Sequence, residues 1–364
     1  MPRIGIVTPH ITSGDAVCND VFGMYDIFQK RGFNTRIYAA DWQLENSRYE
    51  VKSISKIASF LKSADDILIY HHSMGWRAGW ESCSKLPCRK VIKYHNVTPP
   101  EFFAGWSDDY QDVCRSGREQ TSAIAASGCD IYLSASEYNM AELIAEGAPQ
   151  SKCFAVPPFH HIDRLQQVEP DFGIIDTYRD GKPAMLMVGS LFPNKGHVAL
   201  LEIFATYFND YDDSGRLFIV GKEGASLENY SDYLRQTAAQ FGVEEQVVFA
   251  GHVNESALKS FYLMADIFVT VSEHEGFCVP LVESMALGIP VLALGSSAIP
   301  ETVAKTGLVW KDYDCRVFAE SINTLVQDEG LRSSLGQLGR GRYETSFTTE
   351  KIEQRLINAL GTLL

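Results

Sequence analysis

The chain has 364 residues, more than one hydrophobic core usually organises, so two domains of similar size are the default expectation. Hydrophobic residues make up 45% of the chain and charged residues 21%, an ordinary globular composition that is neither disordered nor membrane-like. The net charge of −14 argues against nucleic acid as the main partner.

Charge is divided unevenly along the chain. Residues 1–165 hold 17 Lys and Arg against 19 Asp and Glu, whereas the remaining residues hold 15 against 27. The near-neutral part contains a cluster of four basic residues, Lys85, Arg89, Lys90 and Lys93. This cluster predicts either a solvated face or a surface that contacts an anionic acceptor or a membrane. The N-terminus lacks the hydrophobic region of a signal peptide, and no apolar run reaches the ~18 residues of a membrane span. We therefore expect a cytoplasmic protein whose membrane contact, if any, is peripheral and at the inner face.

Short apolar runs alternate with amphipathic segments in the first half of the chain. The runs predict buried strands at Arg3–Pro9, Thr35–Ala39, Ile67–His71, Val91–His95, Ile131–Ser134 and Phe154–Val156. Helical patterns, each stopped by a glycine, lie at Asp20–Arg31, Asp112–Ser127 and Glu137–Glu146. Apolar strands that alternate with helices predict a parallel sheet covered on both faces.

A proline-containing segment, residues 157–183, breaks this alternation and is the predicted interdomain linker. Beyond it, strands are predicted at Ala184–Val188, Arg216–Val220, Gln246–Phe249, Ile267–Val271, Pro290–Leu294 and Gly307–Trp310. The sequence thus predicts an α/β protein with two Rossmann-like, doubly wound domains, residues 1–165 and 166–348, and a final amphipathic helix, 349–364, that packs back on the first domain. We expect the domains to face each other across a cleft, where the carboxyl ends of both sheets would bind ligands.

The most informative stretch is Ser272–Pro290, which follows a predicted strand and leads into a helix with Pro280 in its first turn. Glu275 would lie in the loop before this helix and Glu283 about one turn inside it. Carboxylates there could accept hydrogen bonds from the paired hydroxyls of a sugar ring or a ribose. By spacing alone, the alternative is two glutamates on the solvated start of a helix.

Two further features favour a negatively charged ligand beside these glutamates. The free amides at the start of the same helix favour a phosphate, and they belong to Gly276, Phe277 and Cys278. In Val188–Gly196, a strand ends in a glycine-containing turn and Lys195 opens the next helix, where its ammonium could neutralise a diphosphate leaving group. The alternative is that Lys195 has no ligand and is simply solvated, as a lysine after a turn usually is.

The first half of the chain offers fewer candidate residues. His95, at the end of a predicted strand, could bond a sugar hydroxyl or an acceptor, or could be a structural hydrogen-bonder. The polar loop that contains Gly14 and Asp15 has the character of a loop facing an acceptor or a phosphate. The glycine patterns of dinucleotide-binding and P-loop proteins do not occur. The histidine pairs 71/72 and 160/161 lack companions at metal-ligand spacing, so no metal or other cofactor is expected.

Taken together, these stretches resemble the GT4 family of retaining glycosyltransferases, which have the GT-B fold. The resemblance covers nearly the whole chain and is strongest in E-G-F-x-x-P-x-x-E, residues 275–283, which matches the family's glutamate pair. Ser296–Val303 is similar to the loop that follows this pair in the family. The sequence of residues 93–102, K-Y-H-N-V-T-P-P-E-F, resembles that of a branch of the family that assembles bacterial polysaccharides.

The resemblance implies a role for each candidate residue. Glu275 would lie by the transferred sugar, Lys195 would bind the diphosphate and His95 would face the reacting sugar. Glu283 would hold the ribose hydroxyls of the nucleotide. The rest of the implied donor-binding set is Gly276, Phe277, Cys278, Gly189, Ser190, Lys222 and Val253, and the acceptor-side loop is Gly14 and Asp15.

The sequence departs from the family pattern at two places. Ser190 stands where the family usually carries an arginine, so the diphosphate would lose one of its two usual cations unless Lys222 or His197 replaces it. Ser13-Gly14 stands where a Gly-Gly pair is common. Both differences bear on ligand contacts rather than on the fold.

The implied reaction is retaining transfer of a hexose from a GDP- or UDP-linked sugar to a glycan or lipid-linked saccharide in polysaccharide biosynthesis. Two alternatives remain open. One is a nucleotide-sugar epimerase or a phosphorylase of the same fold. The other is a non-catalytic nucleotide-sugar-binding subunit, because Ser190 lacks the positive charge of the arginine that the family usually carries there.

Overall fold

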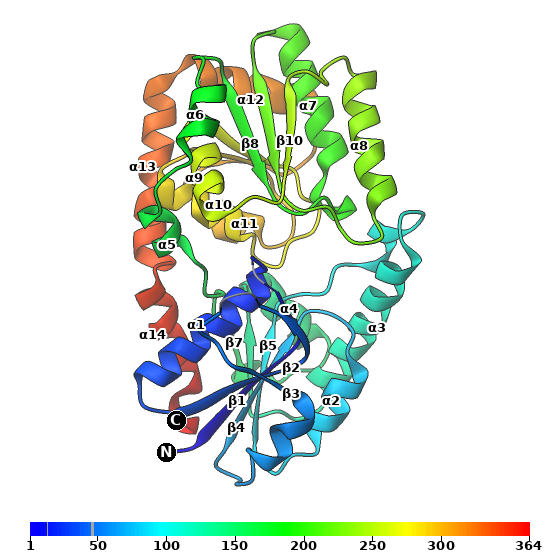
Figure 1. Ribbon diagram of the computed structural model, residues 1–364, viewed down its shortest axis with the longest axis vertical. Helices are drawn as coiled ribbons and strands as arrows, with labels where there is room; N and C mark the ends of the chain where they lie inside the picture. Colours follow the sequence, from blue (N-terminus) through cyan, green and yellow to red (C-terminus); the bar gives the residue numbers. More distant parts are fainter. Residues whose placement is uncertain (13, 45–46) are drawn as a thin grey trace. The chain divides into compact units, whose positions relative to one another are not determined.

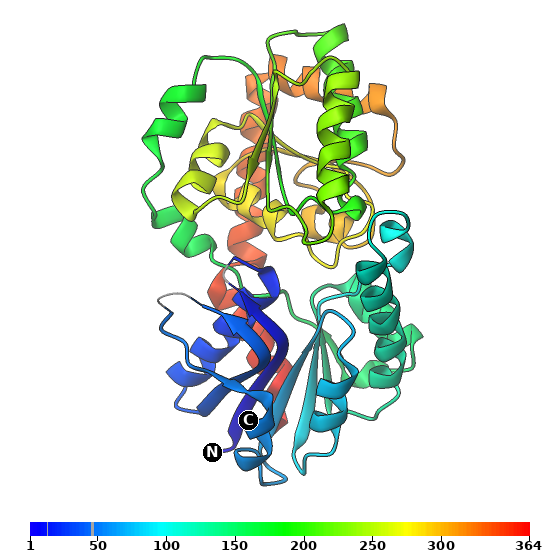
Figure 2. The same cartoon turned by 45° about the vertical axis from the view of Figure 1, so that its right-hand side comes forward.

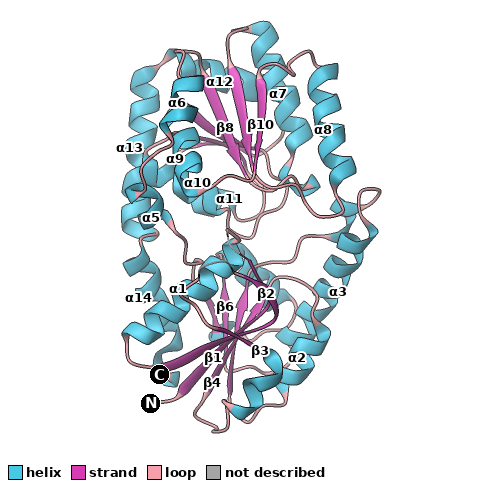
Figure 3. Ribbon diagram, viewed as in Figure 1, coloured by secondary structure: helices cyan, strands magenta, loops and turns pink. Residues whose placement is uncertain are grey.

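The computed structural model describes residues 1–12, 14–44 and 47–364 and divides into two compact units. The first unit comprises Met1–Glu101, Tyr110–His161 and Thr348–Leu364, and the second comprises Phe102–Asp109 and Ile162–Phe347. In each unit, helices cover both faces of a parallel sheet (Figure 3). No described helix is both long enough and apolar enough to cross a membrane.

The described part of the first unit contains a seven-stranded sheet in the order β3-β2-β1-β4-β5-β6-β7. Its strands are β1 (Arg3–Thr12), β2 (Asn34–Gln43), β3 (Val51–Ser53), β4 (Ile67–His72), β5 (Arg89–Tyr94), β6 (Ile131–Ser134) and β7 (Cys153–Ala155). The α-helices that lie wholly or mainly in this unit are α1 (Ala16–Lys30), α2 (Arg77–Ser84), α3 (Asp108–Ala125), α4 (Glu137–Ala145) and α14 (Thr349–Leu360). The short 3-10 helices η1 (Ile54–Ser59), η3 (Gln150–Lys152) and η5 (Gly361–Leu363) lie in this unit, and η2 (Pro100–Phe103) is divided between the two units.

The C-terminal helix α14, red in Figures 1 and 2, is part of the first unit's hydrophobic core. Its apolar positions Ile352 and Leu356 are fully buried in one cluster with Ile4 of β1 and Phe28 of α1. The α14 helix begins where the side chain of Thr348 accepts a hydrogen bond from an amide of its first turn. Sequence-distant segments therefore share one core, although the chain passes through the whole second unit between them.

The described part of the second unit contains a six-stranded sheet in the order β10-β9-β8-β11-β12-β13. Its strands are β8 (Ala184–Val188), β9 (Arg216–Val220), β10 (Val247–Gly251), β11 (Ile267–Thr270), β12 (Val291–Leu294) and β13 (Leu308–Trp310). Its helices are α5 (Ile162–Gln167), α6 (Phe172–Tyr178), η4 (Pro193–Lys195), α7 (His197–Asp210), α8 (Glu228–Gln240), α9 (Glu255–Met264), α10 (Val279–Leu287), α11 (Ile299–Val303), α12 (Cys315–Gln327) and α13 (Glu329–Ser346). Counted from its own first strand, the sheet has the same strand order as the first six strands of the other unit, the order typical of nucleotide-binding doubly wound domains.

Each predicted strand coincides with an observed strand, and their ends differ by a few residues at most. The short strand β3 was not predicted. The segment 157–183, predicted as the interdomain linker, contains the change from the first unit to the second and also the helices α5 and α6. These helices pack on α9, where the ammonium of Lys259 donates to the carbonyls of Gln166 and Val168 at 2.7 and 2.6 Å. The chain passes from the first unit to the second between His161 and Ile162.

A second difference concerns the segment Phe102–Asp109, which belongs to the second unit although the chain on both sides of it belongs to the first. Its rings explain this placement. Phe103 packs against Phe192 with ring centroids 5.9 Å apart, and Trp106 packs against Tyr230 at 4.9 Å. Nothing in the local pattern of residues 102–109 marks these aromatic side chains as part of a different core.

Candidate functional site

The strand order of the second sheet reverses between β8 and β11, which are neighbouring parallel strands. From β8 the chain proceeds to β9 on one side, and from β11 it proceeds to β12 on the other. Loops that leave such a pair of strands diverge, and ligands of open α/β sheets bind at this position. The two loops after β8 and β11 contain Lys195 and Glu275.

The loop after β8 is held close to its neighbours by backbone contacts. The amide of Gly189 donates to the carbonyl of Val220 at 2.9 Å, and the amide of Leu191 donates to the carbonyl of Lys222 at 2.9 Å. Gly196 has φ of 70°, and a Cβ atom there would lie 2.2 Å from the carbonyl oxygen of Val271. Glycine is the residue that combines this left-handed conformation with so close a backbone contact. The contact brings Lys195 against the loop after β11.

Asn194 joins the two loops. Its carbonyl accepts from the amide of Glu273 at 2.9 Å, and its side-chain amide donates to the carbonyl of His274 at 3.0 Å. On the other side of the same loop, the amide of Glu275 donates to the hydroxyl of Ser297 at 2.8 Å. The loop after β11 is therefore fixed at both sides, and Glu275 has a defined backbone position.

The structure brings Lys195 and Glu275 together. The Nζ atom of Lys195 lies 2.7 Å from Oε1 of Glu275, and the two side chains are 21% and 9% exposed. Burial lowers the pKa of Lys195, but the adjacent carboxylate outweighs burial and leaves this pKa above its usual value. Lys195 is therefore a charged ammonium that retains some access to solvent, as a cation that meets an anionic ligand must.

Helix α10 begins directly beside this pair. Cys278 precedes the helix with φ of 70°, a left-handed conformation that is unusual for a residue other than glycine, and no side chain caps the helix. Among the described residues, the amides of Gly276, Phe277 and Cys278 have no hydrogen-bond acceptor. Free amides and the positive end of the helix dipole both favour an anion at this helix start, and the anion site itself stays a prediction.

Glu283 lies inside α10 and is placed differently from Glu275. Its Oε2 accepts a hydrogen bond from the hydroxyl of Tyr262 at 2.6 Å. Burial raises the pKa of Glu283, although the hydrogen bond from Tyr262 acts in the opposite direction. Within the described residues, no hydrogen bond or ion pair joins Glu283 to Lys195 or Glu275. One carboxylate thus precedes α10 and a second, separate carboxylate lies inside this helix.

The remaining donor-side candidates follow adjacent strands of the same sheet. Gly189 and Ser190 are half-buried after β8, Lys222 is exposed after β9, and Val253 is half-buried after β10. His197 does not replace the missing arginine, because burial and the nearby Lys195 lower its pKa to about 3. The ring is neutral at neutral pH and supplies no second cation.

In the first unit, the acceptor-side loop lies at the start of α1. Gly14 is exposed with φ of 78°, and Asp15 caps α1 by accepting from the amide of Cys18 at 3.2 Å. The cap occupies one carboxylate oxygen of Asp15. Ser13, the other half of the predicted Ser-Gly pair, lies outside the described residues.

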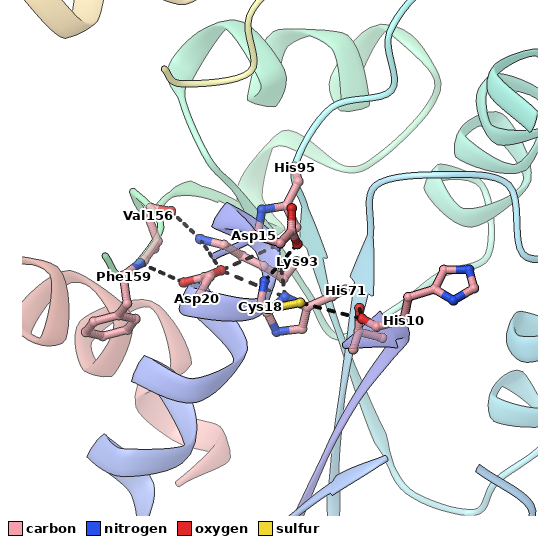
Figure 4. Close-up of polar contacts among 10 residues, drawn as sticks. His10, Asp15, Cys18, Asp20, His71, Lys93, His95, Val156 and Phe159 are labelled. Carbon is pink, nitrogen blue, oxygen red and sulfur yellow. Dashed lines mark hydrogen bonds and ion pairs between the residues drawn. The ribbon is translucent and has the colours of Figure 1, made fainter. Parts of the chain in front are cut away.

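His95 follows β5 and belongs to a buried polar cluster with Asp20, His71 and Lys93 (Figure 4). Nitrogen and oxygen atoms of Asp20, His71 and His95 lie within 4.8 Å of one another, close enough to share a metal ion. However, the ammonium of Lys93 lies 3.6 Å from the Asp20 carboxylate and already neutralises its charge. The three partners of His95 were not predicted. The available signal was that His71 and Lys93 are polar residues inside strands that are otherwise apolar.

The family comparison covers most of the second unit. Residues 176–342 match the family model of glycosyl transferases group 1. A capsular polysaccharide biosynthesis glycosyltransferase of Staphylococcus aureus, CapM, is 30% identical over 179 residues, which are 49% of this chain and 45% of CapM. A GDP-mannose-dependent mannosyltransferase of Mycobacterium tuberculosis, which acts on a phosphatidylinositol monomannoside, is 26% identical over 247 residues, 64% of this chain and 62% of that protein. The matched region thus spans about half to three fifths of the length of these relatives.

Solved structures extend the fold comparison to the whole chain. The structure of HepE from Anabaena in complex with UDP and glucose aligns with a TM-score of 0.80 over 100% of both chains, at 16% identity. WaaG, a glycosyltransferase involved in lipopolysaccharide biosynthesis, aligns with a TM-score of 0.77 over 98% of this chain and 100% of its own, at 15% identity. The protein therefore has the GT-B fold, and its residues 176–342 match the family model of glycosyl transferases group 1.

Proposed function

We propose that the protein is a retaining, GT4-type hexosyltransferase that takes its hexose from a GDP- or UDP-linked sugar. The acceptor would be a glycan or a lipid-linked saccharide in polysaccharide assembly. The observation that carries this proposal is the contact of Lys195 with Glu275 beside the uncapped start of α10. An ammonium, free amides and carboxylates at one sheet edge match the phosphates and hydroxyls of a nucleotide sugar.

Each charged group has a chemical role in this proposal. Lys195 and the amides that start α10 bind the diphosphate, and Glu275 accepts hydrogen bonds from the transferred sugar. Glu283 binds the ribose hydroxyls, with its carboxylate oriented by Tyr262. Gly189, Ser190, Lys222 and Val253 complete the donor-binding set. His95, Gly14 and Asp15 contribute saccharide and acceptor contacts from the first unit.

The reaction follows from where charge develops. The bond between the anomeric carbon and the diphosphate oxygen breaks, and the acceptor oxygen bonds to the anomeric carbon on the same face of the sugar. The proton of the acceptor hydroxyl passes to an oxygen of the departing diphosphate, so no protein nucleophile is needed. Lys195 and the α10 amides stabilise the negative charge that grows on the leaving group, in positions fixed before the reaction begins.

The relatives support the general reaction and leave the base of the nucleotide open. One relative is named for GDP-mannose, and one structural neighbour binds UDP and glucose. CapM is named for capsular polysaccharide and WaaG for lipopolysaccharide. These names are consistent with a nucleotide sugar as donor and a growing glycan or glycolipid as acceptor.

The test begins with a thermal-shift panel of UDP- and GDP-sugars, because a ligand that binds the folded protein raises its unfolding temperature. The stabilising donor is then incubated with oligosaccharide acceptors, and the anomeric configuration of the product is determined by NMR. Retained configuration and release of the nucleoside diphosphate support the proposal. Epimerisation without an acceptor, or cleavage that requires inorganic phosphate, would instead identify an epimerase or a phosphorylase. Donor binding without turnover would indicate a non-catalytic subunit.

A further inference from the structure

The buried polar cluster around His95 is built from groups that are costly to remove from water. We call Asp20, His71, Lys93 and His95 the His95 cluster (Figure 4). The side chains of Asp20, His71 and Lys93 are fully buried, and that of His95 is 7% exposed. Charged groups in such a place require compensation by partners. Within this cluster, only the side chain of His95 is exposed to solvent.

Asp20 and Lys93 face each other: burial raises the pKa of Asp20 and lowers that of Lys93, and the opposite charge of the partner acts against both shifts. The Nζ atom of Lys93 lies 3.6 Å from Oδ2 of Asp20 and donates a hydrogen bond to the carbonyl of Val156. The other carboxylate oxygen of Asp20 accepts from the amide of Phe159 at 2.8 Å. The same Oδ2 lies 3.5 Å from Nε2 of His95 and 3.8 Å from Nδ1 of His71. A carboxylate with a fixed position therefore faces both imidazole rings.

The contact between the two histidines determines which nitrogen of His95 carries its proton. Nδ1 of His71 and Nε2 of His95 are 2.9 Å apart, so one of them donates and the other accepts. Nε2 of His71 is buried without a partner among the described residues. A buried N–H without an acceptor is rarer in proteins than an unpaired acceptor, so the proton of His71 belongs on Nδ1. Nε2 of His95 then accepts this proton's hydrogen bond, and His95 carries its own proton on Nδ1.

The protonation states of both rings fit this arrangement. Burial, followed by the positive charge of Lys93, lowers the pKa of His71 well below its usual value. Burial lowers the pKa of His95 in the same way, with further contributions from His71 and Lys93. Both imidazoles are therefore neutral at physiological pH, and each has one N–H.

The backbone at His95 is fixed as well. The amide of His95 donates to the carbonyl of His72 at 2.9 Å. The next residue, Asn96, has φ of 80°, a left-handed conformation that asparagine tolerates better than most residues. The side-chain amide of Asn96 donates to Oδ1 of Asn139 at 2.8 Å and to Oε2 of Glu142 at 2.7 Å. The chain on both sides of His95 is thus held in place, which limits the positions of its ring.

We propose that the His95 cluster fixes His95 as a neutral Nδ1–H donor to a hydroxyl oxygen of the saccharide, with Asp20, His71 and Lys93 as positioning residues. The identity of the ligand rests on the proposed function, whereas the tautomer rests on the contacts of the cluster alone. His95 does not act as a general acid in this proposal, because its ring is neutral and the N–H of a neutral imidazole is a very weak acid. It orients and polarises a hydroxyl group.

The first test measures the tautomer in the free protein, without a nucleotide sugar. Long-range ¹⁵N–¹H NMR distinguishes the two neutral tautomers of His95, and loss of the signal in His95→Ala assigns it. We expect Nδ1–H in the native protein and a mixed or Nε2–H population in His71→Ala. His71→Asn should restore Nδ1–H, because the asparagine amide can place a donor near the position of Nδ1. An Nε2–H tautomer of His95 in the native protein would overturn the proposal. So would an Nδ1–H tautomer that stays unchanged in His71→Ala.

A matched control is provided by the next residue of the same strand. His72 is as buried as His71, but its ring bonds the hydroxyl of Thr121 at 2.8 Å instead of His95. His72→Asn should cost stability while leaving the His95 tautomer and the turnover number unchanged. A shift of the tautomer in this variant would show that any disturbance of β4 has the same effect, which contradicts a specific role of His71.

The second test is a kinetic double-mutant cycle. We expect His95→Ala to lower kcat by about 10²-fold and His71→Ala by about tenfold, the scales for a lost donor and a misplaced one. The double variant should be no slower than His95→Ala, because His71 acts only through His95. Independent, multiplying effects would contradict the proposal. Stoichiometric metal that copurifies with the protein and is lost in Asp20→Asn would also overturn it, because the cluster would then be a metal site.

The two proposals can fail separately. If no nucleotide sugar is turned over, the proposed function fails, while the NMR measurement still decides how His95 is protonated. If transfer occurs but the tautomer does not depend on His71, only the positioning proposal fails.

Discussion

The second sheet has the same strand order as the first six strands of the first sheet. Each sheet has a lysine and a carboxylate near the point where its strand order reverses, but the two pairs differ in exposure. In the first unit, Asp20 and Lys93 are fully buried and 3.6 Å apart. In the second, Lys195 and Glu275 are 2.7 Å apart and 21% and 9% exposed. A pair that is closed off can only support its neighbours. A pair with access to solvent can exchange one partner for a ligand.

The difference originates in where each lysine is attached. Lys93 is inside β5, in register with His71 of β4, so its side chain points into the layer beside the sheet. Lys195 lies in η4, beyond the end of β8, where the loop after β11 passes over it. The same fold thus provides a buried ion pair from within a strand and a partly exposed ion pair from a loop, and the second is the pair that we propose to bind the donor. The predictions below test this contrast.

The largest expected effect is on the stability of the first unit. Lys93→Met leaves the buried carboxylate of Asp20 without its cation, and we expect a loss of about 3–5 kcal/mol in the free energy of unfolding. The double variant Asp20→Asn/Lys93→Met should recover a large part of this loss, because it removes both charges. Urea unfolding measures both values. Lys182→Met, which changes an exposed lysine of the second unit, is the control and should stay within about 0.5 kcal/mol of the native protein. A Lys93→Met protein of native stability would show that the pair is not ionised.

The second effect is on turnover in the second unit. Lys195→Ala should lower kcat by about 10²-fold or more, because it removes an oriented charge from the leaving group. It should cost less stability than Lys93→Met, because Glu275 can still contact water. Steady-state kinetics with the cognate donor, and Lys182→Ala as a control of native activity, measure this split. Near-native turnover of Lys195→Ala would remove this residue from the mechanism.

The third effect concerns donor affinity. Glu283→Ala should raise the donor KM by about tenfold or more and change kcat little, the size expected for lost hydrogen bonds to a charged group. Tyr262→Phe separates the ribose contact from a local packing change, because it removes the hydroxyl that orients the carboxylate and keeps the ring. This variant should raise KM less than Glu283→Ala. An unchanged donor KM in Glu283→Ala would contradict the ribose role.

The contrast between the units also shows which parts of the structure could be predicted from the sequence. Strands of the second sheet such as Ala184–Val188 were predicted to the residue, because apolar runs between glycines and polar turns give a strong local signal. The strand Val51–Ser53 was missed because three residues give no periodicity. Lys195 and Glu275 were assigned to the same ligand through the family resemblance, and their direct contact was not predicted. Their contact depends on a glycine at residue 196 that fits against the backbone of another strand.

The His95 cluster could not be predicted, for a physical reason. Asp20, His71 and Lys93 come from a helix and two strands, and no sequence spacing connects them. A polar residue in an apolar strand signals that a partner exists but does not identify it. The segment Phe102–Asp109 illustrates the same limit, because its aromatic residues pack in the core of the second unit. Local patterns predict elements, while partners are determined by how the elements pack.

The smallest effect expected is the contribution of one buried histidine to the pH dependence of stability, and such histidines occur in both units. Burial lowers the pKa of His72 to about 4 and those of His71 and His95 well below the usual value, while in the second unit burial and Lys195 lower that of His197 to about 3. Below pH ~6.5 the unfolded chain binds protons that these folded residues do not, so stability falls as the pH falls.

Each such histidine contributes a slope of about 1.4 kcal/mol per pH unit, which for His72 extends from pH ~6.5 down to its folded pKa of about 4. Urea unfolding at pH 7, 6 and 5 measures the total slope. His72→Asn removes one of these groups and should reduce the slope between pH 6 and 5 by about that amount. An equal slope in the variant and the native protein would mean that His72 is protonated in the folded state. In that case the buried layer beside β4 would be more accessible to water than its contacts indicate.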